Sequence, residues 1–294
     1  MELLRKPNIS DFFLALSIFD EQGIEREAKK LISVTYKILD TAIQQRMHYT
    51  LAKGERKDFL QFALEYHNHE DSAILITMQQ LKAVLMDIVV GETETVTAIV
   101  EWVMAEMMQH PEEMKKVQEE LTEVVGLNNL VEEFHLPKLH HLDAVVKETF
   151  RLHPALPLLV PRCPSESATI GGYTILRGTT VFMNAWAIHR DPSLWDNPLE
   201  FRPQSFLDPS NKFDYMGNKF QYVPFGSGRR ICAGLPLAER MLTFELASFL
   251  HSFEWRLPND TKLNLSENFG LVVKKMAPLF AIATPRLSRF ELYT

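Results

Sequence analysis

The feature that most constrains the fold is a helical pattern over about residues 74–109, far longer than an average helix of a globular domain. Apolar residues such as Leu81, Ile88 and Trp102 occupy most of its sides. A helix that is apolar nearly all round is buried, so we expect it in the middle of a domain. Its one polar cluster, Gly-Glu-Thr-Glu-Thr at residues 91–95, by itself indicates a place where the helix reaches the surface.

The rest of the chain predicts a mainly α fold with small β-sheets, an α+β class. Apolar periodicity predicts further helices over residues 24–51, 59–66, 111–125, 139–152 and 237–250, after a short amphipathic piece at residues 8–19. Apolar runs between turn residues predict short strands at 158–160, 169–170, 173–175, 180–183, 271–273 and 279–283. An irregular, proline-rich meander is expected over residues 191–220.

Composition narrows the classes of function. The chain has 294 residues and a formal net charge of −7, from 31 Lys and Arg against 38 Asp and Glu, which argues against a nucleic-acid partner. Its two cysteines, Cys163 and Cys232, exclude a disulfide framework and a multi-cysteine zinc or iron–sulfur site, and a reducing compartment is expected. The N-terminal residues contain no apolar run long enough for a signal peptide or a membrane span.

Cys232 lies in a stretch, residues 224–238, that combines a loop with the start of a helix. Glycines allow a tight loop before the cysteine, and an apolar helical pattern begins at Leu237. Unpaired N–H groups and the macrodipole at a helix N-terminus favour negative charge, so a thiolate there would be available to a metal. The alternative is an ordinary buried cysteine in a glycine-containing turn.

The residues around Cys232 follow a longer pattern, Phe-x-x-Gly-x-Arg-x-Cys-x-Gly, which is rarely met by chance. It is filled by Phe225, Gly228, Arg230, Cys232 and Gly234. This segment resembles the haem-ligand loop of the cytochrome P450 superfamily. The resemblance implies that the Cys232 thiolate is the proximal ligand of the iron of haem b (iron protoporphyrin IX) and donates electron density that promotes O–O cleavage. It also implies that Phe225 packs by the sulfur, that Arg230 meets a haem propionate, and that Gly234 lets the helix approach the porphyrin.

The polar cluster of the long helix resembles the helix I motif of the same family, which crosses the distal face of the haem. Gly91 then takes the place of its small residue, Glu94 that of its acid and Thr95 that of its alcohol. Such an acid–alcohol pair can hold water and relay the protons that split dioxygen. Glu92 stands where a Gly is usual, and Val96 replaces the second hydroxyl residue. Because a carboxylate at position 92 would project into the groove for dioxygen, we expect impaired or altered oxygen activation.

Glu148 and Arg151 lie three residues apart on one predicted helix, followed by a His-Pro pair. An exposed ion pair of little energetic value is the ordinary interpretation of this spacing. The motif also resembles helix K of the family, where the pair is buried and structural. The third member of that network is usually an Arg, and Ser205 stands in its place here. We therefore expect Glu148 to lose one cationic partner, and Arg202 is the residue that could compensate.

Three residues between the helix K motif and the cysteine loop complete the assignment. Arg162 matches the place where the family sends an Arg to a haem propionate, Cys163 is expected to be semi-buried, and His189 is expected to be a hydrogen-bonded structural residue. Residues 10–26 resemble the segment between helices F and G of plant microsomal members. We therefore expect residues 1–294 to form a single haem-binding domain, incomplete at its N-terminus, that corresponds to the C-terminal portion of the cytochrome P450 fold.

The resemblance as a whole implies a haem-thiolate monooxygenase that inserts one oxygen atom of O2 into a small hydrophobic substrate, such as a secondary metabolite. Electrons would come from NADPH through a flavoprotein reductase. The intact family is expected at the cytosolic face of the endoplasmic reticulum membrane, held by an N-terminal anchor. Because this sequence shows no such segment, a cytoplasmic location is the alternative. Two other functions stay open: a truncated, inactive haem-binding remnant, and a helical interaction protein without a cofactor.

Overall fold

The computed structural model describes residues 8–9, 13, 19–49, 57–68, 76–208, 213–259 and 261–293. The chain divides into two compact units, residues 1–93 and 94–294, and each is described by itself. Most of the amphipathic piece predicted at residues 8–19 lies outside the described residues. Within the described part, helices predominate and the strands are short, so the predicted α+β class is confirmed.

The first unit contains α2 (Ile24–Met47) and α3 (Phe59–Asn68), which pack against each other. The carboxylate of Asp20 accepts hydrogen bonds of 3.0 Å from the backbone N–H groups of Glu25 and Arg26, and so caps the start of α2. A small apolar core forms around Ile43, Ala63, Leu64 and Leu81. Both predicted helices are confirmed, although the first ends earlier than expected.

The predicted long helix is α4 (Met78–Gln109). A reciprocal capping box starts it, because Gln80 N–H donates to Thr77 Oγ1 at 3.2 Å while Thr77 N–H donates to Gln80 Oε1 at 2.9 Å. Pro111 then opens α5 (Pro111–Val124), since proline is tolerated in the first turn of a helix but not in its interior. None of the described helices, α4 included, has the length and apolarity required to cross a membrane.

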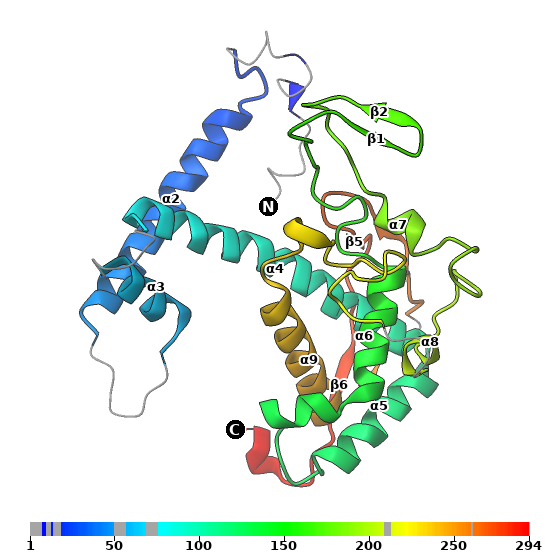
Figure 1. Ribbon diagram of the computed structural model, residues 1–294. Coiled ribbons are helices and arrows are strands. Elements are labelled where there is room, and N and C mark those ends of the chain that lie inside the picture. Colours follow the sequence, from blue (N-terminus) through cyan, green and yellow to red (C-terminus); the bar gives the residue numbers. More distant parts are fainter. Residues whose placement is uncertain are drawn as a thin grey trace. The chain divides into compact units, whose positions relative to one another are not determined.

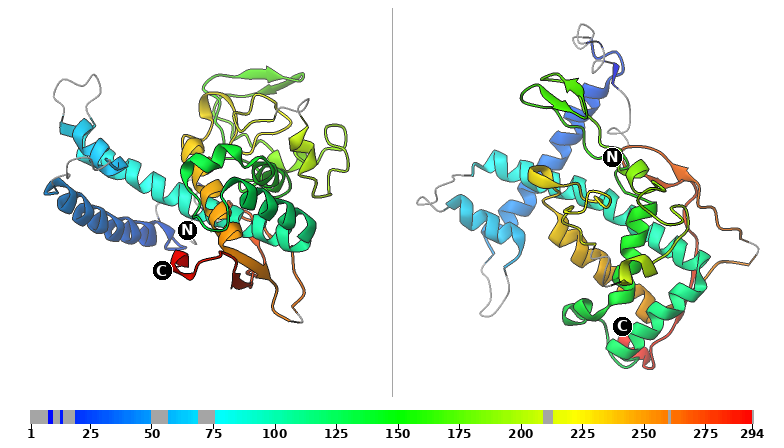
Figure 2. Two further views of the ribbon diagram at one scale, coloured as in Figure 1. Left: turned by 90° about the horizontal axis from the view of Figure 1, so that it is seen from below. Right: turned by 45° about the vertical axis from the view of Figure 1, so that its right-hand side comes forward.

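The second unit is built on three helices that pack together, α5, α6 (His140–Leu152) and α9 (Leu235–Ser252) (Figure 1). Figure 2 shows α9 beside the same helices from two further directions. Their apolar faces and the second half of α4 share one core. Its buried members include Ile99, Val103, Leu142, Leu246 and Leu250. Short helical segments fill the connections: η3 (Glu133–Lys138), α7 (Ala185–Ile188), α8 (Gln204–Leu207), η4 (Gly228–Arg230) and η5 (Phe290–Tyr293).

The described strands of the second unit form three two-stranded antiparallel sheets. β1 (Ala168–Ile170) pairs with β2 (Tyr173–Ile175), and the two glycines between them have φ values of 57° and 84°, as a tight hairpin turn requires. β3 (Phe253–Arg256) pairs with β6 (Ile282–Pro285). β4 (Glu267–Asn268) pairs with β5 (Lys274–Lys275), and Lys274 of this hairpin forms an ion pair with Glu94 of α4.

Three of the predicted strands are wrong. Residues 158–160 have no regular structure, and residues 180–183 make only one isolated bridge, at Val181. Residues 271–273 are irregular too, because pairing begins one residue later, in β5. Leu159, Val272 and Val273 are buried without strand pairing, whereas Val160, Phe182 and Leu271 are exposed, so apolar character did not indicate a strand here. β3 was not predicted, because it follows α9 directly and no Gly or Pro marks the change from helix to strand.

Replacement of a core leucine on α9 tests this packing. Leu246 is fully buried, so Leu246→Ala is expected to lower the free energy of unfolding by about 2–5 kcal/mol. Leu237, on the same helix, is 46% exposed, and Leu237→Ala should change stability by less than about 0.5 kcal/mol. Urea denaturation of the purified variants measures both values. Equal losses for the two variants would contradict the assigned core face.

Candidate haem site

The cysteine loop presents its thiol in front of α9. Gly226 and Gly228 have φ values of 76° and 66°, which lets the chain turn sharply before the cysteine. The backbone N–H of Cys232 then donates to the carbonyl of Phe225 at 3.0 Å, which closes the loop on itself. Gly234 is the N-cap residue of α9, so Cys232 lies two residues before the N-cap and three before the first helical residue, Leu235. Cys232 is exposed and forms no disulfide, and its predicted place at a helix start is confirmed.

The surroundings of the thiol are open on one side and packed on the other. A Cβ atom at Gly234 would lie 3.7 Å from Cys232 Sγ, so a longer side chain there would cover the sulfur. Phe225 belongs to the packed side, with its ring centroid 5.1 Å from that of Phe150 and 5.6 Å from that of Tyr215. The loop therefore rests on an aromatic cluster while its thiol faces outward.

Two arginines come together at this loop. Arg162 Nη2 donates to the carbonyl oxygen of Arg230 at 3.0 Å, across 68 residues of sequence. A Cβ atom at Gly226 would lie 3.5 Å from the same Arg162 nitrogen, so the glycine leaves room for the guanidinium. Arg162 alone would pass for a surface charge in the sequence, yet the fold places it at the cysteine loop. Its neighbour Cys163 is exposed rather than semi-buried, which corrects that expectation.

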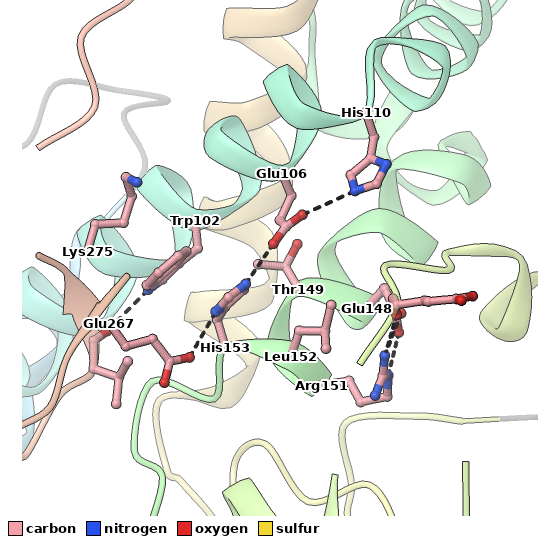
Figure 3. Close-up of polar contacts among 12 residues, drawn as sticks. Trp102, Glu106, His110, Glu148, Thr149, Arg151, Leu152, His153, Glu267 and Lys275 are labelled. Carbon is pink, nitrogen blue, oxygen red and sulfur yellow. Dashed lines mark hydrogen bonds and ion pairs between the residues drawn. The ribbon is translucent and has the colours of Figure 1, made fainter. Parts of the chain in front are cut away.

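The Glu148–Arg151 pair is buried, as the helix K resemblance implied, with both residues at most 2% exposed (Figure 3). Arg151 Nε donates to Glu148 Oε2 at 2.7 Å and Arg151 Nη2 to Glu148 Oε1 at 2.8 Å. The guanidinium also donates to the backbone carbonyls of His189, Pro198 and Glu200, at 2.7–2.9 Å. All five N–H groups of the guanidinium thus have an acceptor. The pair ties α6 to the meander.

The missing third arginine is replaced in an unexpected way. The backbone N–H of Arg202 donates to Glu148 Oε1 at 2.6 Å, so the compensation expected of Arg202 comes from its main chain. Ser205 lies in α8, where its own N–H bonds the Arg202 carbonyl at 3.1 Å. Glu148 therefore receives three hydrogen bonds, a charge-assisted pair from Arg151 and one from a backbone amide.

His189 joins this network to the cysteine loop. The backbone N–H of Val223, just before the loop, donates to His189 Nε2 at 3.0 Å, which requires that nitrogen to be unprotonated. Burial, together with the charges of Arg151 and Arg190, lowers the pKa of His189 to about 3. The ring is therefore neutral at physiological pH, and it is a structural acceptor, as expected, rather than a ligand.

The predicted distal residues lie on α4. Glu94 is buried and forms an ion pair with Lys274 of β5, a partner that the sequence did not reveal. Thr95 is half-buried, and Glu92 is half-buried too. Gly91 is exposed, and a Cβ atom there would meet no other atom within 4 Å. The roles of Glu94 and Thr95 in proton transfer stay predictions, as does the effect of Glu92.

The donor set fits a haem better than another cofactor. An exposed thiol supplies a soft, anionic ligand for iron. The Arg162 guanidinium, which bonds the Arg230 carbonyl on the same loop, suits the carboxylate of a haem propionate. Because Gly234 has no side chain, nothing at this position lies between the start of α9 and the sulfur, from which a Cβ atom would be only 3.7 Å away.

Comparison with known proteins then settles the family. A family model described as Cytochrome P450 matches residues 1–281. The chain belongs to the cytochrome P450 family. Its curated relatives include a flavonoid 3',5'-hydroxylase of Solanum melongena, 40% identical over 97% of this chain and 56% of the relative. An iridoid oxidase of Catharanthus roseus is 41% identical over 98% of this chain and 56% of the relative.

Solved structures agree with this membership. A zebra fish cytochrome P450 in a structure with progesterone matches with a TM-score of 0.77 and 29% identity, over 92% of this chain and 60% of that one. The predicted cytochrome P450 fold is therefore confirmed. The chain spans 56% of the length of each of the two curated plant relatives named above.

Restoring the family's usual arginine tests the network around Glu148. Ser205→Arg is expected to leave Tm unchanged within about 2 °C, since three donors already satisfy the Glu148 carboxylate. Thermal unfolding followed by circular dichroism measures the change. A conservative Ser205→Thr variant controls for substitution at this place in α8. A clear rise in Tm for the arginine variant alone would mean that Glu148 lacks a cation.

The neutral state of His189 predicts a dependence of stability on pH. The unfolded chain takes up a proton at His189 below pH 6.5, whereas the folded chain does so only near pH 3. The free energy of unfolding should therefore fall as pH decreases between these values, by up to about 1.4 kcal/mol per pH unit. Urea denaturation at pH 7.5 and 5.5 should show this loss in the wild type and a smaller one in His189→Gln. His48→Gln, at an exposed site, should keep the full loss.

Proposed function

We propose that this chain contains the haem-binding and oxygen-activating part of a haem-thiolate monooxygenase that oxidises a plant secondary metabolite. The observation that carries the proposal is the geometry of the cysteine loop, where an exposed free thiol lies next to two arginines. When bound, haem b supplies the iron centre that activates dioxygen and transfers one of its oxygen atoms to the substrate.

The residues of the cysteine loop bind and orient the cofactor. Cys232 provides the thiolate ligand, and the hydrogen bond from its N–H to Phe225 fixes the backbone that carries it. Gly234 keeps the approach to the sulfur free of side chains. Arg230 and Arg162 hold the two propionates by charge-assisted hydrogen bonds. Such fixed positions matter because a ligand displaced by a fraction of an ångström alters reactivity.

The residues of α4 handle protons. The Glu94 carboxylate takes up a proton from solvent, and the Thr95 hydroxyl passes one toward the site of oxygen activation. Because Glu94 is buried, only a small part of it can meet solvent, which confines the place where the proton enters. Glu92 adds a second carboxylate two residues before Glu94, at a position where a glycine is usual in the family, and we expect it to impair or alter oxygen activation.

The names of two relatives support the class of substrate, and the resemblance to the family supports the electron source. One relative is named a flavonoid 3',5'-hydroxylase and another an iridoid oxidase, and a plant secondary metabolite of a related kind is the substrate that we expect for the present chain. Electrons come from NADPH through a flavoprotein reductase, and the whole protein belongs at the endoplasmic reticulum membrane. No nucleic acid takes part.

A paired cysteine replacement tests the proposal. The chain is reconstituted with haem, reduced and treated with carbon monoxide, and the wild type is expected to give the Soret shift of a thiolate-ligated haem. Cys232→Ser should lose this band, while Cys163→Ser, at the other exposed cysteine, should keep it. A histidine-like band, or the same spectrum for both variants, would contradict ligation by Cys232.

Turnover separates the remaining functions. With reductase and NADPH, the reconstituted chain should convert a flavonoid or an iridoid to an oxygenated product, as detected by mass spectrometry. A thiolate-type band without any product would indicate an inactive haem-binding remnant. No haem binding at all would leave a helical interaction protein.

A further inference from the structure

The ion pair between Glu94 and Lys274 joins the polar cluster of α4 to the β4–β5 hairpin near the end of the chain. The Glu94 side chain is 8% exposed and that of Lys274 is 33% exposed. A carboxylate this buried is stabilised in its charged form by a nearby cation. Lys274 is therefore a direct neighbour of the group to which the proposed function assigns proton uptake.

The backbone around Lys274 is held by several contacts, which set the position from which its side chain starts. Lys274 pairs with Asn268 in the register of β4 and β5. Its neighbour Val273 donates its N–H to the Ala155 carbonyl at 2.9 Å and accepts from Trp102 Nε1 at 3.3 Å. The hairpin is thus held both to the segment after α6 and to α4 itself.

A buried polar cluster anchors the other strand of the hairpin (Figure 3). His153 lies between two carboxylates, with Nε2 2.7 Å from Glu106 Oε1 and Nδ1 3.2 Å from Glu267 Oε1. Glu106 belongs to α4 and Glu267 to β4, so the imidazole bridges helix and hairpin. The ring also stacks on Trp102 with the centroids 3.8 Å apart. Arg190 pairs with Glu267 at 3.3 Å and completes the cluster.

Charged groups also hold the β4–β5 hairpin to α4. Burial acts to raise the pKa of Glu267, but its hydrogen bond with His153 and the charge of Arg190 outweigh it, and the pKa is lowered. Lys275, next to Lys274, lies with its Nζ 5.4 Å from the Trp102 ring centroid. The hairpin is consequently pinned to α4 at Trp102 and Glu106, on the same helix that carries Glu94.

We infer that Lys274 is a positioning residue for Glu94: its ammonium fixes the direction of the carboxylate, and Glu94 must exchange this contact before it takes up a proton. The inference rests on the proposed function. In each cycle a solvent proton binds to a Glu94 oxygen, Thr95 accepts it and gives up its own proton, and Glu94 returns to the carboxylate. Lys274 keeps its three protons throughout and re-forms the ion pair. The hairpin thereby sets how readily Glu94 is protonated.

Thermal unfolding of the chain without haem tests the pairing. In a cycle of Glu94→Gln and Lys274→Gln, the double variant should lose less Tm than the sum of the single losses, by roughly 2–4 °C. The difference should fade as the pH falls and Glu94 becomes protonated. Lys262→Gln, at an exposed lysine before the hairpin, should combine additively with Glu94→Gln. Additive losses for Lys274→Gln as well would overturn the inference.

The pH profile of turnover by the reconstituted chain tests the role of the pair. Lys274→Gln should move the limb that belongs to Glu94 to higher pH by roughly one unit, because the carboxylate loses the cation that favours its charged form. Lys274→Arg keeps a cation and should restore the wild-type profile, which a merely structural role would not explain. An unchanged profile in Lys274→Gln refutes the inference. A missing thiolate-type band refutes the proposed function instead, so the two failures are distinguishable.

Discussion

A single buried guanidinium, that of Arg151, holds the irregular half of the second unit to its helices. Segments without regular structure leave backbone carbonyls without a hydrogen-bond donor. Arg151 donates to three such carbonyls at once. A cation can be buried in this way only when a carboxylate compensates its charge, and Glu148 does so from the preceding turn of the same helix. A lysine has no planar fork and could not satisfy the same set of acceptors.

The orientation of the thiol depends on that guanidinium through two routes. Along the first, His189 accepts from Arg151 with its carbonyl and from Val223 with its ring, which sets the start of the cysteine loop. Along the second, Arg151 lies 5.2 Å from the ring centroid of Trp195, which begins an aromatic cluster. That cluster continues through the meander to Phe225, beside the cysteine. Both sets of contacts connect Arg151 of α6 to the loop that carries Cys232, the iron ligand of the proposed enzyme.

Much of the fold could be predicted because the buried face of a helix requires apolar residues at regular intervals in the sequence. The long helix, α6 and α9 carry apolar faces that local spacing reveals, and the Glu148–Arg151 pair is itself a local i,i+3 spacing. The cysteine loop was recognisable for the same reason, since its determinants lie within ten residues. Arg162 was placed only by resemblance to the family, because nothing near it in the sequence indicates contact with the loop.

The remaining features depend on the path of the backbone. The residue type at position 202 could not predict the hydrogen bond from the main-chain N–H of Arg202 to Glu148, because every residue except proline has a main-chain N–H group. Nor does the sequence near Lys274 name Glu94 as its partner. The strand expected at residues 158–160 failed because Leu159 adopts a φ of 51° and is buried without pairing. An apolar run predicts that residues are buried, but it does not predict whether their backbone pairs with another strand.

The bond from Trp102 to Val273 has a consequence for the order of events during synthesis. It joins residues 171 positions apart, and Arg286 likewise reaches back 168 positions to the Gln118 carbonyl. As the chain leaves the ribosome, α4 and α5 emerge long before these partners exist. Parts of both helices therefore stay uncovered during synthesis until the segment from Val273 to Arg286 has been translated.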